Sequence, residues 1–362
     1  MIEKPMLQRI FDALREAGFT LIGPTIADGA IVYDEIGGLS DLPVGWRDEQ
    51  GPGSYRLRRR DDDRYFGFVV GPHSWKRYLY PPVLKLFSTR KTPAGIEVEP
   101  DGEAPMRFAF IGVRACDLAA IGVQDRVFLE GAVQDPHYKA RRQAAFVLAV
   151  NCVEPGGVCF CASMKTGPRC ASGFDLALTE LDEGFLVEVG SELGAQVLAG
   201  VPWRPAGAFV LNRARRLLEE AATRMGRALE TKDLPGLLYE NLEHPRWAEV
   251  ALRCLACANC TLVCPTCFCA DVQDTSDLAG EQAARVRVWA SCFDGAFSHV
   301  YGGNLRPTVR ARYRQWLTHK LAAWIEQFGI SGCVGCGRCI TWCPVGIDLT
   351  EEVAAIREAP RS

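Results

Sequence analysis

Two cysteine runs of identical spacing constrain this chain more than any other feature of its sequence. In each run the four cysteines are separated by two, two and three residues, and a proline follows the last one. The first run consists of Cys254, Cys257, Cys260 and Cys264. The second run consists of Cys333, Cys336, Cys339 and Cys343. Spacings of two let one loop place three thiolates on three corners of an iron–sulfur cube, while the fourth Cys reaches the other cube.

The two runs therefore predict two clusters with crossed ligands. The predicted ligands of cluster 1 are Cys254, Cys257, Cys260 and Cys343. The predicted ligands of cluster 2 are Cys333, Cys336, Cys339 and Cys264. A pair of zinc sites or scattered core cysteines is the alternative, but two identical runs with both prolines are hard to reach by chance.

The cellular compartment that we infer from the sequence is one in which cysteines act as metal or cluster ligands. The first residues lack a basic segment followed by an apolar core, so we expect no secretory signal. The uninterrupted apolar runs are far too short for a membrane span, and we expect a cytoplasmic, soluble chain. Thiols stay reduced in the cytosol, so 16 cysteines, most of them tightly grouped, indicate metal or cluster ligands rather than disulfides.

The balance of positive and negative residues bears on whether the chain binds nucleic acid. Lys and Arg total 41 against 44 for Asp and Glu, which gives a net formal charge of -3. A chain with this balance gives no reason to expect a nucleic-acid partner.

A third group of cysteines surrounds a predicted strand–helix–strand unit. Residues 107–113 and 144–150 have the apolar character of buried parallel strands, and residues 117–128 between them have helical periodicity, with Asp117 placed as the N-cap. Cys116 follows the first strand and Cys152 follows the second, at the strand ends where sites are usually found.

Two more thiols lie in the loop after the second strand. Cys159 and Cys161 follow Gly156 and Gly157, which allow that loop to fold back tightly. Four convergent thiolates fit either a third iron–sulfur cluster or a tetrahedral zinc, and the spacing leaves both open. Cys170 is a possible substitute ligand, although a free thiol is the simpler interpretation.

The remaining elements predict an α+β protein. We expect an N-terminal mixed α/β domain over residues 1–240 and a mostly helical, ferredoxin-like dicluster domain over residues 241–362. Further predictions are a helix at 6–17, hairpins over 19–36 and around Asp182, a strand at 64–71, irregular structure near Pro81, a helix at 210–229, a polar connector at 231–244, a strand at 285–289 and a helix at 308–328 closed by Gly329.

Few other residues suggest chemistry. Cys267, Cys269 and Cys292 could bind another metal, with His299 as a weak fourth ligand, but small buried residues packing beside a cluster are the favoured interpretation. The histidines form no zinc-binding pattern, and no dinucleotide or phosphate loop is present. We therefore expect no catalytic site.

Several specific segments give the chain a family resemblance. They are GVRACDLAAI, NCVEPGGVCFCASMKTGP, GFDLALTEL, CPTCFC, GGNLRPTVRARYR and CVGCGRCITWCPVGIDL. Together they resemble the iron–sulfur β subunit of soluble NAD(P)-linked nickel–iron hydrogenases, also called sulfhydrogenases. The electron-transfer subunit of anaerobic sulfite reductases is a related but less close match. The resemblance extends from about Leu79 to Leu349.

The resemblance implies an electron-carrying subunit with three [4Fe-4S] clusters. It moves the third site away from zinc, and the matching positions are Cys116, Cys152, Cys159 and Cys161. Cys170 often has a non-cysteine counterpart in the family, which argues against it as a ligand. The implied partners are a flavin subunit that exchanges hydride with NAD(P)H, and the small and large hydrogenase subunits. The alternatives are the equivalent subunit of an anaerobic sulfite reductase and a stand-alone iron–sulfur redox sensor.

Overall fold

A six-stranded sheet forms the centre of the N-terminal part. The computed structural model describes residues 1–100 and 106–358, and the strand order is β10-β9-β8-β7-β1-β2. The strands are β1 Thr20–Ala27, β2 Ala30–Glu35, β7 Phe108–Val113, β8 Phe146–Val150, β9 Leu176–Leu181 and β10 Gly184–Val189. The four inner strands are parallel, and an antiparallel hairpin closes each end of the sheet. Both predicted hairpins and the parallel β7–β8 pair are confirmed.

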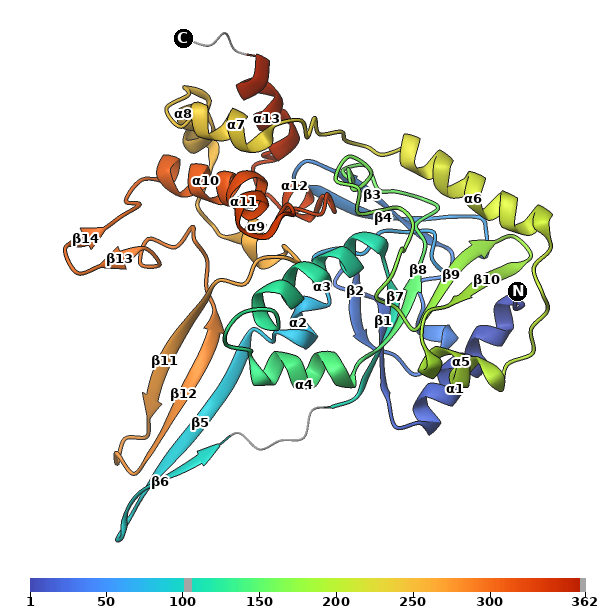
Figure 1. Cartoon of the computed structure of the whole chain (residues 1–362), viewed down its shortest axis with the longest axis horizontal. Coiled ribbons are helices and arrows are strands. Elements are labelled where there is room, and N and C mark those ends of the chain that lie inside the picture. The colour runs from blue at the N-terminus through green and yellow to red at the C-terminus, as the bar shows by residue number, and fades with distance from the viewer. Residues whose placement is uncertain (101–105, 359–362) are drawn as a thin grey trace.

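Helices cover this sheet (Figure 1). They are α1 Leu7–Glu16, α2 Lys76–Leu79, α3 Ala115–Phe128, α4 Pro136–Ala144, α5 Glu192–Ala199 and α6 Ala208–Thr223. Helices α3 and α4 are in contact, since the Tyr138 hydroxyl donates a hydrogen bond to Asp125 at 2.7 Å and its ring packs against Phe128. The inner strands are buried on both faces, as their continuous apolar sequences predict, with Phe110, Leu148 and Leu178 at most 1% exposed.

The prediction of a strand at 64–71 is wrong. Side chains satisfy the backbone of this segment in place of a neighbouring strand. The Glu180 carboxylate accepts hydrogen bonds from the backbone N–H groups of Tyr65 and Phe66, at 2.8 and 2.9 Å. Arg114 donates to the carbonyl oxygens of Phe66 and Phe68. The apolar residues are buried, but their backbone groups are paired outside a sheet.

A second, antiparallel sheet projects from the body as an arm (Figure 1). Its strand order is β11-β12-β5-β6, with β5 Val83–Thr92, β6 Gly95–Pro100, β11 Ala270–Ser276 and β12 Gln282–Trp289. Strand β12 contains the predicted strand 285–289. The irregular structure expected near Pro81 and Pro82 ends at once, because β5 begins at the next residue and pairs with β12. This sheet therefore joins the segments on either side of residue 240.

The C-terminal part contains short helices around the cysteine runs. They are α7 Leu234–Glu240, α8 Arg246–Arg253, α9 Asn259–Leu262, α10 Val309–Thr318, η3 His319–Ala323, α11 Trp324–Phe328, α12 Arg338–Thr341 and α13 Leu349–Glu358. Helix α7 replaces the polar connector predicted at 231–244, because its Leu234 and Leu238 are buried. The helix predicted at 308–328 is present as α10, the π-helical turn η3 and α11, and Gly329 closes it with φ 71°.

The remaining elements are small. They are the hairpins β3 Trp46–Gly51 with β4 Ser54–Arg59 and β13 His299–Val300 with β14 Gly303–Asn304, and the 3-10 turns η1 Lys4–Met6 and η2 Leu39–Asp41. The α+β class is confirmed, whereas the division into two domains stays a prediction. Across the described ranges, no helix combines the length and apolar character that crossing a bilayer requires.

Candidate metal centres

The predicted third group of thiols lines one cavity, which we call the third site. Its walls include Cys116, Cys152, Cys159 and Cys161. Cys116 lies in the first turn of α3, directly after β7, and Cys152 lies two residues after β8. Because β7 and β8 are parallel neighbours, their carboxyl ends bring these two thiols to the same edge of the sheet.

The loop that carries the other two thiols folds back as the glycine pair predicts. A Cβ on Gly157 would lie 2.3 Å from the carbonyl oxygen of Gln50, so only glycine fits there. Gly226 approaches the same glycine, where a Cβ would lie 2.1 Å from the Gly157 oxygen. This contact explains why α6 ends at Thr223 rather than at the predicted residue 229. The chain leaves the helix there and packs on the loop. The backbone N–H of Arg227 donates a hydrogen bond to the carbonyl oxygen of Cys159.

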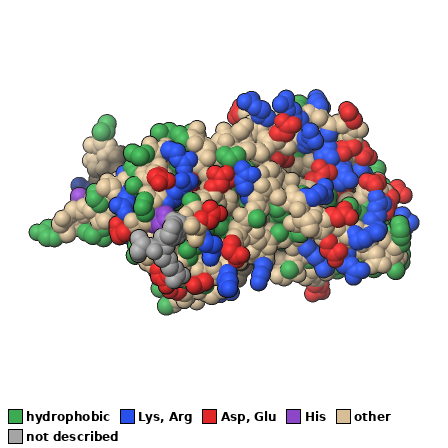
Figure 2. All heavy atoms as spheres, turned by 90° about the horizontal axis from the view of Figure 1, so that it is seen from above, with side chains coloured by type: hydrophobic (Ala, Val, Ile, Leu, Met, Phe, Trp, Pro, Cys, Tyr) green, Lys and Arg blue, Asp and Glu red, His purple; other side chains and the backbone are tan. Residues whose placement is uncertain are grey.

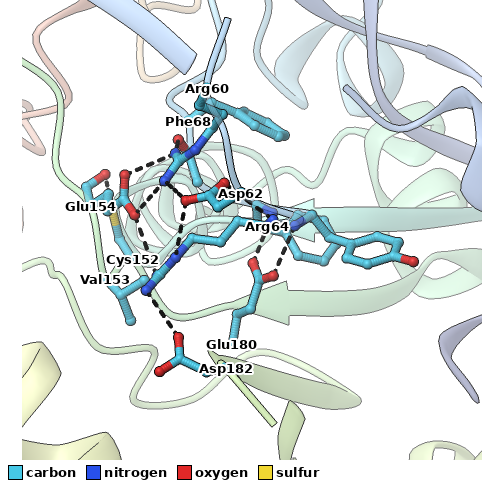
Figure 3. Close-up of polar contacts among 12 residues, drawn as sticks. Arg60, Asp62, Arg64, Phe68, Cys152, Val153, Glu154, Glu180 and Asp182 are labelled. Atoms are coloured by element: carbon cyan, nitrogen blue, oxygen red, sulfur yellow. Dashed lines mark hydrogen bonds and ion pairs between the residues drawn. The ribbon is translucent and has the colours of Figure 1, made fainter. Parts of the chain in front are cut away.

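Charged side chains hold the turn around Cys152 (Figure 3). Arg60 donates two hydrogen bonds to the Glu154 carboxylate, both at 3.0 Å, and one to Asp62 at 2.6 Å. Arg64 lies 3.4 Å from Glu154 and 3.5 Å from Asp182. The network fixes Glu154, whose carbonyl oxygen is 3.4 Å from the Cys152 sulfur. These residues carry no sequence signal of their role, because their partners lie far away in the chain.

Cys170 lies outside the third site. Its side chain packs against Ala115, Ala149 and Ala177, and its N–H donates a 2.7 Å hydrogen bond to Asn151. Burial raises the pKa of its thiol to about 12. Among the described residues that line the third site, Cys116 is present and Cys170 is not. The geometry therefore favours Cys116 as the fourth thiol.

The two cysteine runs line two further cavities with their members crossed. The walls of the first cavity, site 1, include Cys254, Cys257, Cys260 and Cys343. The walls of the second cavity, site 2, include Cys264, Cys333, Cys336 and Cys339. Cys343 in site 1 and Cys264 in site 2 come from the other run, as the spacing predicts, and Cys339 of the second run also lines site 1.

The three cavities share walls in a fixed order. Cys336 lines both the third site and site 2, and Cys339 lines both site 2 and site 1. Direct contacts support this order, because the Phe160 N–H donates to the Gly335 oxygen at 2.9 Å and the Thr166 hydroxyl donates to the Val334 oxygen at 2.6 Å. Site 2 therefore lies between the other two.

The spread of the donor groups indicates what these cavities could hold. Throughout residues 1–100 and 106–358, no three His, Cys, Asp or Glu side chains converge as the ligands of one metal ion. This statement covers Cys267, Cys269, Cys292 and His299 as well. The thiols instead stand around cavities, as a multi-atom group requires. All-cysteine donor sets in cavities of this kind fit iron–sulfur clusters.

The buried thiols need a strong counter-charge to ionise. Burial raises the pKa of Cys161 to about 12, and it does the same for Cys333. Iron binding would supply that counter-charge, because thiolates and not thiols are the ligands. Backbone N–H groups already point at two sulfurs of site 1, from Ala256 to Cys254 at 3.4 Å and from Ile347 to Cys343 at 3.3 Å.

Two buried charged groups beside the cavities were missed in the sequence. The prediction that Asp117 is the N-cap of α3 is wrong. Arg114 occupies that position, and Asp117 pairs with the buried Arg338 instead. Lys320 lies against Cys264 beneath site 2. A lysine within an otherwise apolar stretch of a predicted helix was the only sequence signal for it.

Comparisons with known proteins agree with this chemistry. A family model described as a 4Fe-4S dicluster domain matches residues 253–347, which contain both cysteine runs. Sulfhydrogenase 2 subunit beta from Pyrococcus furiosus is 31% identical over 355 residues, covering 96% of this chain and 95% of that protein. No solved structure matches the chain significantly. These similarities, with the cysteine sets described above, show an iron–sulfur electron-transfer subunit that carries [4Fe-4S] clusters. The chain belongs to the family of iron–sulfur beta subunits of sulfhydrogenases.

Proposed function

We propose that this chain passes electrons along three [4Fe-4S] clusters in the order third site, site 2, site 1. The carrying observation is that Cys336 lines both of the first two cavities and Cys339 lines both of the last two. Cavities that share a lining residue are direct neighbours. This arrangement suits conduction better than three separate structural centres would.

Each cavity has its own proposed ligand set. The site 1 ligands are Cys254, Cys257, Cys260 and Cys343. The site 2 ligands are Cys264, Cys333, Cys336 and Cys339. The third-site ligands are Cys116, Cys152, Cys159 and Cys161. When bound, each cluster would exchange single electrons at a potential set by its charge, hydrogen bonds and exposure.

The chain's own residues would protect and align the centres. Val158 and Phe160, which flank Cys159 in the third-site loop, are at most 1% exposed and pack against Gly335 and Gly337 of the second cysteine run, where they exclude water. The hydrogen bond from Phe160 to Gly335 keeps that loop in register with site 2. The Asp117–Arg338 ion pair ties α3 to the same run. These contacts would hold the spacing between centres constant.

The proposed partners lie at the two ends of this series. We propose a flavin-containing NAD(P)H-oxidoreductase subunit, together with the small and large hydrogenase subunits. The support is that the relative from Pyrococcus furiosus is, by its name, one subunit of a sulfhydrogenase.

Site 1 has the surface of a protein contact. Cys257 is exposed, and beside it Leu255 is 63% and Leu252 is 89% exposed. Hydrophobic side chains also gather at the left end of Figure 2, where hairpin β13–β14 lies, and charged ones are denser over the opposite end. Exposed apolar groups of this kind mark interaction surfaces. An exposed ligand among them would bring a docked partner close to the cluster.

A redox titration with isolation of the native complex tests the proposal. Anaerobically purified chain should show clusters that a low-potential donor reduces, and the chain should co-purify with a flavoprotein and a nickel–iron protein. Clusters that cannot be reduced would exclude conduction. A siroheme protein in place of the nickel–iron protein would keep the conduction and overturn the proposed partners.

A further inference from the structure

Lys320 carries a buried positive charge directly beneath site 2. Its Nζ lies 3.2 Å from the Cys264 sulfur, 3.0 Å from the Thr266 hydroxyl and 3.5 Å from the carbonyl oxygen of Gly332. The residue is 6% exposed. The Thr266 hydroxyl is itself 3.1 Å from the same sulfur, so one cation and one hydroxyl group contact a single ligand atom.

No carboxylate neutralises this lysine within the part of the chain that the structure describes. The ion pairs found there involve other cations, and the oxygens around Lys320 come from a hydroxyl and a carbonyl group. Burying an ammonium group without a counter-charge is strongly unfavourable. The negative charge available to it is that of the cysteine sulfurs. The position of Lys320 is therefore explained by an anionic group in site 2.

The local backbone is built to bury this residue. Lys320 is the second residue of the π-helical turn η3, which interrupts a long helix. Lys320, Leu321 and Ala322 of this turn are all buried. Single π-helical turns inside α-helices are frequently found at functional sites.

Site 1 has no equivalent cation on its sulfurs among the described residues. The sulfurs of Cys254 and Cys343 accept backbone N–H groups. A second buried lysine, Lys76, adds positive charge near Cys264, but its Nζ donates hydrogen bonds to the carbonyl oxygens of Thr261 and Leu262 and lies 3.8 Å from the centre of the Trp289 ring. Within the described ranges, Lys320 is the cation with a hydrogen bond to a predicted ligand sulfur.

We infer that Lys320 raises the reduction potential of the cluster in site 2 and makes this central site favour the reduced state. The inference rests on the proposed function. Reduction adds one negative charge to a cluster, and a fixed cation in a low-dielectric interior stabilises the reduced form more than the oxidised form. Hydrogen bonds to ligand sulfurs act in the same direction. Lys320 thus acts through the positive charge that it places beside Cys264. An electron would reside longest on the cluster in the middle of the series.

Substitutions at Lys320 test the inference by potential and not by activity. The central signal is first identified as the one lost in Cys264→Ser. In a titration followed by electron paramagnetic resonance, Lys320→Met should lower the reduced-to-oxidised ratio of that signal about tenfold or more at the parent midpoint, which corresponds to about 59 mV for one electron. Lys320→Arg should stay near the parent value. Lys4→Met removes a buried lysine that pairs with Asp63, and it should leave all the midpoints unchanged.

The outcomes separate this inference from the proposed function. If Lys320→Met keeps the iron content and the central midpoint of the parent chain, the inference is overturned while conduction stands. If no cluster of the parent chain can be reduced, conduction itself fails. Should Lys320→Met lose iron, Lys320→Gln keeps a hydrogen-bond donor without the charge. A midpoint of Lys320→Gln equal to that of the parent then overturns the inference, and a lowered midpoint supports it.

Discussion

Arg338 and Asp117 form a doubly hydrogen-bonded ion pair, with Nη1 2.8 Å from Oδ1 and Nη2 3.2 Å from Oδ2. Both side chains are at most 4% exposed, and the Tyr33 hydroxyl donates a third hydrogen bond to the carboxylate at 3.1 Å. Arg338 lies two residues after Cys336, and Asp117 directly follows Cys116. One buried contact therefore connects the third site to the second cysteine run.

Loss of this ion pair should destabilise the whole chain. Asp117→Asn leaves the Arg338 charge buried and uncompensated, which should lower the free energy of unfolding by about 3–5 kcal/mol. Asp125→Asn, on the same helix, keeps an oxygen that can accept the Tyr138 hydrogen bond and loses only the charge of a half-buried pair with Arg142, so it should cost about 1 kcal/mol or less. Denaturant unfolding of both variants measures the difference. Equal effects of the two substitutions would show that the buried pair has no special role.

The fourth ligand of the third site should be Cys116. Cys116→Ser should remove the third cluster and leave the signals of the other two, because Cys116 lines the cavity. Cys170→Ser is the matched control, since its thiol packs among alanines, and it should retain every cluster. Iron content with resonance spectra distinguishes the variants. Loss of the third cluster from Cys170→Ser alone would reverse the assignment.

Crossed ligation predicts an effect across the two runs. Cys343→Ser should impair the cluster held mainly by the first run, because its sulfur lines site 1 with Cys254 and Cys257. Cys264→Ser should impair the other cluster for the corresponding reason. Spectra of the two variants should each lack a different signal. If each substitution removed the cluster of its own run, the crossed arrangement would be wrong.

The charged network around Cys152 should matter for retention of the third cluster. Arg60→Met removes both hydrogen bonds to Glu154 and should weaken cluster retention about 10- to 100-fold, as is typical for groups that orient ligands. Arg58→Met, which removes an exposed pair with Glu49, is the control. Chelator competition followed by iron release measures retention. Identical release from both variants would contradict a supporting role for this network.

Local patterns predicted most of the elements and the grouping of the cysteines around the cavities, but not the contacts between distant segments. The strands β7 and β8, their parallel pairing and the cysteines at their ends follow from short apolar runs and from the direction of a parallel sheet. The crossed sets in sites 1 and 2 follow from spacing alone. Each of these predictions rests on a pattern that is contained in a short stretch of the chain.

The errors occurred where tertiary contacts override local preference. The segment 64–71 is apolar enough for a strand, yet Glu180 and Arg114 satisfy its backbone from other elements. Asp117 has the sequence position of a helix cap, but its carboxylate pairs with Arg338, which lies 221 residues away in the chain. No window of sequence contains that information.

The central claim, three clusters in one chain, is tested most directly by quantitative iron and acid-labile sulfide analysis of the anaerobically prepared protein. Three cubes of four irons each predict about twelve irons and as many sulfides per chain, without zinc. About eight irons together with one zinc would contradict the claim, because the third site would then hold a different metal and the series would end at site 2.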